Sequence, residues 1–166
     1  MEKTHWKKNN DSKFISGEDL KSELNGLKPE MIVSIEKFND AETFDQNSQS
    51  KKVITGLWLK DHNSGKAIYK PVILNKTNAK FFVKETGSDF VDDWIGRPVI
   101  LYALKDSRHG FVTRFKSYVK PTLVKDSENF NKAKMALLSG SYTMEQVKSR
   151  YVVSSEVEGL LNAKWD

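Results

Sequence analysis

Cysteine is absent from the 166 residues of this sequence, and long apolar runs are absent as well. Without cysteine the chain has no disulfides and no thiolate metal site, which fits a reducing compartment. No apolar stretch approaches the roughly 20 residues that a membrane-spanning helix needs. The charged N-terminal residues MEKTHWKKNND lack the apolar segment of a secretory signal. These absences predict a cytoplasmic protein that does not associate with a membrane.

Sequence motifs of common enzymes are also missing. The three histidines, His5, His62 and His109, do not have the spacing of metal ligands. There is no phosphate-binding glycine loop, no nucleophile elbow and no HExxH zinc motif. We therefore expect no enzymatic activity, no catalytic residues, no metal and no cofactor. A carboxylate cluster assembled from distant positions is the remaining enzyme alternative.

Positive charge is concentrated in the middle of the chain. Between Lys51 and Lys120 there are fourteen Lys and Arg against six Asp and Glu, whereas the rest of the chain has a deficit of three positive charges. The whole chain has a net charge of +5. A polyanionic partner such as nucleic acid explains such an excess. The alternative is a lysine-rich surface that only keeps the protein soluble.

Alternation of apolar and polar residues predicts five strands with one helix among them. The strands are expected at Met31–Phe38, Lys51–Lys60, Lys66–Asn75, Val99–Lys105 and Phe111–Val119. A helix is expected at Thr77–Thr86, capped by Thr77 and ended by Gly87. The polar residues Asn39–Ser50 indicate a long mobile loop. The order β-β-β-α-β-β is that of an OB-fold, a five-stranded Greek-key barrel that binds oligonucleotides or oligosaccharides.

Short helices are expected at both ends of this segment. Ser16 and the acidic residues after it indicate a helix near Gly17–Leu24. After Pro121 the pattern predicts three helices, the second begun by a capping box at Thr143 and the third by one at Ser155. We therefore predict a mainly β protein with helical additions. Residues 1–124 form the OB-fold-like barrel with its N-terminal arm, and residues 125–166 form a helical appendage.

The last strand gives the strongest indication of a binding surface. Arg114, Lys116 and Tyr118 alternate with Phe115 and Ser117, so the two cations and the ring share one face. Cations neutralise phosphates and rings stack on bases, which suits single-stranded nucleic acid. The alternative is a strand face that is only solvated.

Further binding candidates lie in the other strands and their connections. Trp58 is predicted to be a stacking platform, with a barrel-core Trp as the alternative, whereas Trp94 is expected to be structural because it sits at a turn. The remaining candidates are cations and a histidine in or near the strands: Lys51, Lys52, Lys60, Lys70, Arg108 and His109.

Three segments of the chain resemble a known group of proteins. Lys3–Lys8 (KTHWKK), Val72–Lys80 (VILNKTNAK) and Asp93–Ala103 (DWIGRPVILYA) are similar to segments of small tailed-phage and prophage proteins encoded among replication and recombination functions. The resemblance covers roughly Lys3–Val119. It implies an accessory protein with an OB-fold that binds single-stranded DNA in the cytoplasm of a bacterial or phage-infected host cell. It supplies no catalytic residues.

The expected function is therefore binding of single-stranded nucleic acid, DNA before RNA, in phage replication or recombination. The alternative is a protein-interaction module. In that case the barrel or the C-terminal helices bind a replication, recombination or host-defence protein.

Overall fold

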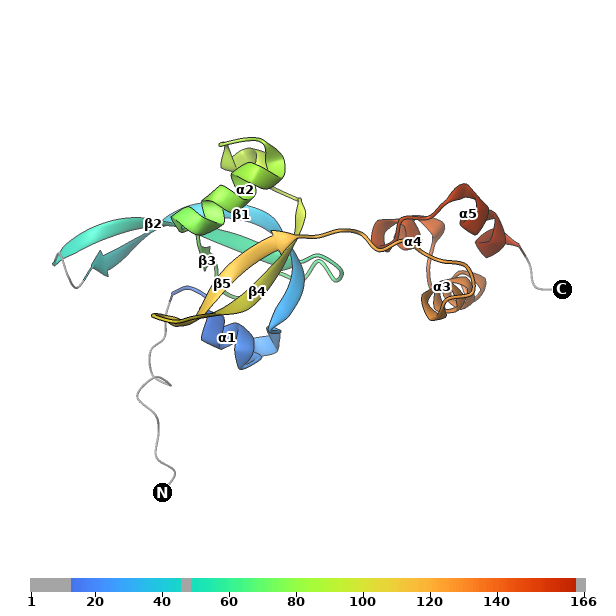
Figure 1. Cartoon of the computed structure of the whole chain (residues 1–166), viewed down its shortest axis with the longest axis horizontal. Helices are drawn as coiled ribbons and strands as arrows, with labels where there is room; N and C mark the ends of the chain where they lie inside the picture. Colours follow the sequence, from blue (N-terminus) through green and yellow to red (C-terminus); the bar gives the residue numbers. More distant parts are fainter. Residues whose placement is uncertain (1–12, 46–48, 164–166) are drawn as a thin grey trace, which may run out of the picture. The chain divides into compact units, whose positions relative to one another are not determined.

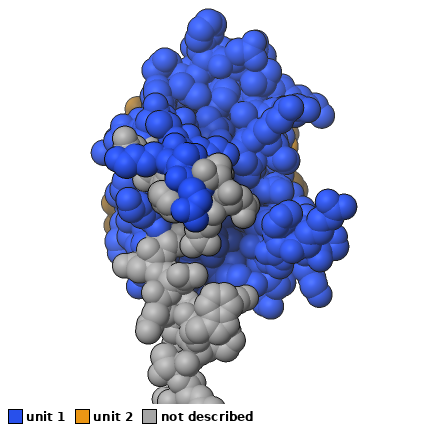
Figure 2. Space-filling view, turned by 90° about the vertical axis from the view of Figure 1, so that its left-hand side faces the viewer, with its two compact units in different colours: residues 1–118 blue, residues 119–166 orange. Residues whose placement is uncertain are grey.

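The structure is a computed structural model that describes residues 13–45 and 49–163 and the side chains of these residues except 41–45. The chain divides into two compact units, Met1–Tyr118 and Val119–Asp166, which Figure 2 colours separately. The sequence places the boundary after residue 124, but Leu123 is buried in the second unit, where its N–H donates to the carbonyl of Val152 at 2.9 Å. No described helix is long and apolar enough to cross a membrane. The segment Lys3–Lys8 lies outside the described residues.

The first unit is built on one five-stranded sheet in which every neighbouring pair of strands is antiparallel (Figure 1). The strands lie in the order β3-β2-β1-β4-β5. Strands β3 and β5 are the two edges, and no ladder joins them within the described residues. The strand bounds are β1 Glu30–Asp45, β2 Ser50–Asp61, β3 Val72–Ile73, β4 Pro98–Asp106 and β5 Gly110–Ser117.

Two α-helices and two short 3-10 turns flank this sheet. Helix α1 (Gly17–Lys21) packs at the start of β5, where a side chain on Gly17 would collide with the backbone of Phe111. Helix α2 (Lys76–Thr86) lies at the other end of β5, where the Ser117 hydroxyl donates to the Glu85 carboxylate at 2.6 Å. Figure 1 shows the sheet between these helices. The 3-10 turns are η2 (Leu24–Gly26) and η3 (Val91–Trp94).

The core lies under one face of the sheet and is closed by aromatic rings. Phe82 of α2 is fully buried, and its ring centroid lies 4.9 Å from Phe115 and 5.1 Å from Trp94. The Trp94 indole N–H donates to the carbonyl of Ser88 at 3.0 Å, so this buried ring has its polar partner. The structural role expected for Trp94 is confirmed. The strands contribute a buried apolar set that includes Val33, Ile35, Leu57, Leu59, Val99 and Leu101.

The predicted loop Asn39–Ser50 is wrong, because β1 continues to Asp45 and β2 begins at Ser50. Strand β4 pairs with β1 only up to Ser34, and β3 pairs with β2 only at Gly56 and Leu57. The far half of the β1–β2 hairpin is therefore a two-stranded arm, and the described part of the chain places no third strand beside it (Figure 1). On the β2 side of this arm Lys51, Lys52 and Val53 are exposed. A strand with exposed side chains on both faces does not need one apolar face, so the sequence lacks the alternation that reveals a strand.

The predicted third strand Lys66–Asn75 is mostly wrong, because only Val72–Ile73 forms a strand. Pro71 directly precedes it and has no N–H for a ladder. The carbonyl of Pro71 instead accepts a hydrogen bond from Ile15 at 2.9 Å. Helix α2 is also capped differently from the prediction. The side chain of Asn75, not Thr77, accepts from the N–H of Asn78, whereas Gly87 ends the helix at φ 73° as predicted.

The second unit holds three helices around its own small core. They are α3 (Glu128–Leu138), α4 (Met144–Arg150) and α5 (Ser155–Asn162). The capping box predicted at Thr143 is confirmed. The cap predicted at Ser155 is wrong by one residue, because the side chain of Ser154 accepts from the N–H of Val157. The buried side chains of this core are Leu123, Phe130, Ala133, Val147, Val157 and Leu161.

The adjacent serines at the start of α5 give a matched test of this cap. Ser154→Ala removes an acceptor for a helix N–H, so we expect it to lower the stability of α5 by about 1 kcal/mol. Ser155→Ala removes only an exposed hydroxyl in the first turn, so its effect should stay within about 0.5 kcal/mol. Amide hydrogen exchange in α5 measures both. Equal effects of the two substitutions would contradict the assignment of the cap to Ser154.

Candidate nucleic-acid interface

The face of the sheet opposite the core carries cations and rings from four strands. Leu57 and Leu59 are buried, so Trp58 and Lys60 between and beside them point away from the core. Phe115 is buried in the same way, so Arg114 and Lys116 also point away from the core. We call this surface the outer face. It is formed by Glu30, Ile32, Ser34, Lys37, Trp58, Lys60, His62, Ile100, Tyr102, Arg114, Lys116 and Tyr118.

Trp58 lies at the β2 end of the outer face and is half-buried. It stands opposite Lys37 of β1, whose Nζ lies 5.4 Å from the centroid of the Trp58 ring. This is the distance of a cation–π contact. Because Trp58 faces away from the buried Leu57 and Leu59 and is not one of the core residues, the alternative that it belongs to the barrel core is wrong. Lys60 lies two residues further along β2, opposite Ser34.

Arg114 and Lys116 lie at the β5 end of the outer face beside Tyr102. Lys116 Nζ is 2.7 Å from a Glu30 carboxylate oxygen and 5.3 Å from the centroid of Tyr102, and its side chain is 47% exposed. Arg114 Nη1 donates to the carbonyl of Thr113 at 2.8 Å. A lysine has three donors and an arginine five, so both cations keep donors for a phosphate. The pairing with Glu30 nevertheless offsets part of the positive charge at this end.

A smaller cluster joins the two ends of the outer face. The Ser34 hydroxyl lies 2.9 Å from His62 Nδ1, and the His62 ring centroid is 6.1 Å from that of Tyr118. Ser34 is buried, whereas His62 and Tyr118 are half-buried. Glu30 stands opposite Tyr102, and Lys37 stands opposite Trp58. At about 3.3 Å per residue, the seven steps along β1 between them correspond to roughly 20 Å, which is long enough for several nucleotides.

The structure places the other candidate residues outside this surface. Lys51 and Lys52 lie on the β1–β2 arm, and Lys70 lies in the connection between β2 and β3, with its Nζ 5.5 Å from the centroid of Tyr69. Arg108 and His109 form the exposed turn between β4 and β5. Of the ten residues selected from the sequence, the outer face thus unites Trp58, Lys60, Arg114, Lys116 and Tyr118.

The turn between β4 and β5 is organised by Asp106. Its carboxylate accepts the N–H groups of Arg108 and His109 at 2.9 and 3.0 Å, and His109 Nδ1 lies 3.0 Å away. These hydrogen bonds, the one from the Arg108 backbone foremost, hold the pKa of Asp106 below its usual value. The backbone of Arg108 and both the backbone and the ring of His109 therefore help to close the hairpin.

Among the outer-face residues that were not selected from the sequence, three carry a ring or a cation: Lys37, His62 and Tyr102. Tyr102 alternates with the buried Leu101, but its place beside Arg114 follows only from the β4–β5 register. Lys37 reaches Trp58 through a bulge between Ile35 and Lys37, which shifts the β1–β2 register. His62 lies in a turn segment, where no periodic pattern assigns a face. The alternation around Tyr102 was the one signal available from the sequence.

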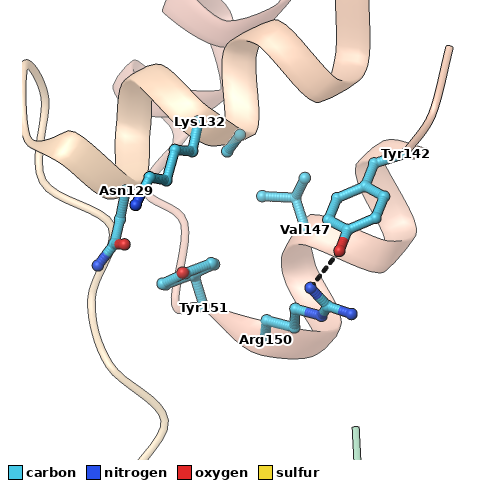
Figure 3. A pocket seen from close by; sticks show the side chains of 7 residues that line it. Asn129, Lys132, Tyr142, Val147, Arg150 and Tyr151 are labelled. Carbon is cyan, nitrogen blue, oxygen red and sulfur yellow. Dashed lines mark hydrogen bonds between the residues drawn. The ribbon is translucent and has the colours of Figure 1, made fainter. Parts of the chain in front are cut away.

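The second unit has a pocket of its own, drawn in Figure 3. It has a volume of about 160 Å³ and is lined by residues of α3, α4 and the segments next to them. The Arg150 guanidinium donates to the Tyr142 hydroxyl and lies 4.7 Å from the centroid of that ring. Lys132 pairs with Glu128 at 2.5 Å, which raises the pKa of Lys132 and lowers that of Glu128. The lining residues are Asn129, Lys132, Ala133, Tyr142, Val147, Arg150 and Tyr151.

Among the described residues, no three His, Asp or Glu side chains lie together as a metal site. Comparison of the chain with known protein families, with characterised proteins and with solved structures finds no significant match.

Proposed function

We propose that this protein binds single-stranded nucleic acid, DNA before RNA, along the outer face. One observation carries the proposal. Two separated parts of the chain contribute cations and rings to one sheet surface opposite the core: Trp58, Lys60, Arg114, Lys116 and Tyr118. Lys37 and Tyr102 add a further cation and ring to this surface. Alternating cations and rings match the phosphates and bases of a single strand.

The proposal includes an OB-like fold for the first unit. In support, the strand order β3-β2-β1-β4-β5 and the helix between β3 and β4 agree with a barrel that would close between β3 and β5. The proposed role is that of an accessory protein in phage replication or recombination, acting in the cytoplasm of the host cell. The support for this role is the resemblance of the sequence segments to tailed-phage proteins.

Binding by this surface should depend steeply on salt and only modestly on base sequence, because phosphates and base faces are common to all strands. The test is titration of labelled oligo-dT at two salt concentrations, beside a duplex of equal length. We expect the single strand to bind more tightly than the duplex. We also expect Arg114→Ala/Lys116→Ala to reduce the salt slope by about 0.7 for each lost phosphate contact.

The matched control is Lys80→Ala/Lys84→Ala, which removes two exposed lysines of α2 and so changes the net charge equally. This control should leave the salt slope close to that of the unchanged protein. If both double variants lower the slope alike, net charge and not the outer face governs binding.

A second function, binding of a protein partner, is favoured by one feature of the second unit. Met135 and Leu138 lie on α3 at a spacing of three residues, and they are 70% and 53% exposed. Neighbouring exposed apolar side chains on a helix suit contact with another protein. Absence of oligonucleotide binding at low salt would favour this second function over the first.

A further inference from the structure

A hollow of about 240 Å³ lies at the Glu30 end of the outer face. Ile32 and Ile100 stand directly opposite each other on β1 and β4 and are half-buried, so they give the hollow an apolar floor. The other lining residues are Met31 and four polar residues, Lys28, Glu30, Asp61 and Asn63, which form a rim that is mostly polar. A hollow of this volume suits one small planar group.

The carboxylate of Asp61 on this rim is held in place and charged. Its Oδ1 accepts the backbone N–H groups of Asn63 and Ser64 at 3.1 and 2.7 Å and the Ser64 hydroxyl at 2.8 Å. Partial burial by itself raises the pKa of Asp61, but these hydrogen bonds and the charge of Lys28 outweigh it and hold the pKa below its usual value. The group is therefore an anionic acceptor at neutral pH, and its Oδ2 accepts no hydrogen bond from the described residues.

We propose that this hollow holds one base of the bound strand and prefers cytosine, whose exocyclic amino group donates to the rim carboxylates, over thymine. The inference rests on the proposed function. Carboxylates accept from the N4 amino group of cytosine, whereas thymine presents a carbonyl oxygen at the same position. The apolar floor of Ile32 and Ile100 suits the face of the base.

Charge also decides which part of the strand enters the hollow. The carboxylates of Glu30 and Asp61 repel phosphates, so the backbone should stay outside. Lys116 Nζ lies 2.7 Å from a Glu30 carboxylate oxygen, and Lys28 lies on the rim. These two cations can therefore contact the phosphates on either side of the bound base. A base that points inward between two phosphates that stay outside satisfies both conditions.

The experiment compares labelled oligo-dC with oligo-dT of equal length, on the full chain and at one salt concentration. We expect oligo-dC to bind at least about fivefold more tightly, the low end of discrimination by one good base contact. In Asp61→Asn the amide keeps an acceptor for the turn but replaces the other carboxylate oxygen by a donor. The preference should then disappear or turn towards oligo-dT, while binding of oligo-dT stays at least as tight.

Two further variants serve as controls for this experiment. Asp89→Asn removes the charge of an exposed carboxylate outside the hollow and should keep the preference for oligo-dC. Glu30→Gln changes the other rim carboxylate without touching the turn that Asp61 holds, and it should also weaken the preference for oligo-dC. Equal, salt-dependent binding of the two oligonucleotides by the unchanged protein would overturn the inference and leave the proposed function intact. No binding of either oligonucleotide at low salt would overturn the proposed function, and the inference with it.

Discussion

Phe82→Ala is expected to lower the free energy of unfolding of the first unit by about 3–5 kcal/mol, the usual cost of removing a buried aromatic ring. Phe82 is fully buried between Phe115 and Trp94, with ring centroids 4.9 and 5.1 Å away. Its loss leaves a cavity between α2 and the sheet that these large rings cannot fill without moving. The measurement is unfolding in urea followed by circular dichroism.

The same substitution at Phe90 is the control for this result. Phe90 is 73% exposed, so Phe90→Ala removes an equal side chain from a site with little packing. We expect its unfolding midpoint to stay close to that of the unchanged protein. Similar midpoints for the two variants would show that α2 does not close the core through Phe82.

The second large effect is expected on binding. Trp58→Ala should weaken the affinity for oligo-dT by about 1–3 kcal/mol, or roughly 5- to 150-fold, because one stacked base loses its platform. Trp58 lies outside the buried core, so the fold should be retained. The readouts are fluorescence anisotropy of labelled oligo-dT for affinity and circular dichroism for the fold.

Two further variants distinguish loss of base stacking from the loss of any aromatic side chain. Trp58→Phe keeps an aromatic face and should recover part of the affinity. Tyr69→Ala removes an exposed ring of the first unit that lies outside the outer face, so it should have little effect. If Trp58→Ala and Tyr69→Ala weaken binding equally, or if neither does, Trp58 is not a stacking platform.

These tests also bear on how the outer face works as a whole. Lys116 is paired with Glu30, and Arg114 donates to its own strand, so neither cation starts free of partners. A strand that binds here gains phosphate contacts and weakens the Lys116–Glu30 pair. An exposed ion pair of this kind contributes little to stability, so the exchange costs little.

The first unit shows which features local sequence patterns predict well. Strands β2, β4 and β5 follow from residues that alternate between core and surface, such as Leu57, Trp58 and Leu59. The cap at Thr143 and the end of α2 at Gly87 follow from side chains that satisfy the helix ends. The arm of the β1–β2 hairpin was missed because its described residues Lys51, Lys52 and Val53 are exposed and show no apolar alternation. Strand β3 was overextended because Pro71 limits its pairing.

The same local alternation of side chains explains why part of the candidate site could be predicted from the sequence. Arg114 and Lys116 share a face because successive side chains of any strand point to opposite sides. That rule says nothing about the neighbouring strand. The contacts of Lys37 with Trp58, of Lys116 with Glu30 and of His62 with Tyr118 each join residues at least 21 positions apart in the sequence.

The sequence by itself determined where most strands and helices lie and which faces of β2 and β5 are polar, because both depend on interactions between residues close along the chain. Only the tertiary structure decided the strand order, the register and the bulge in β1. These arise from backbone pairing between distant segments, and backbone groups are the same in every residue except proline. The outer face and the hollow beside Glu30 exist only once that pairing is made.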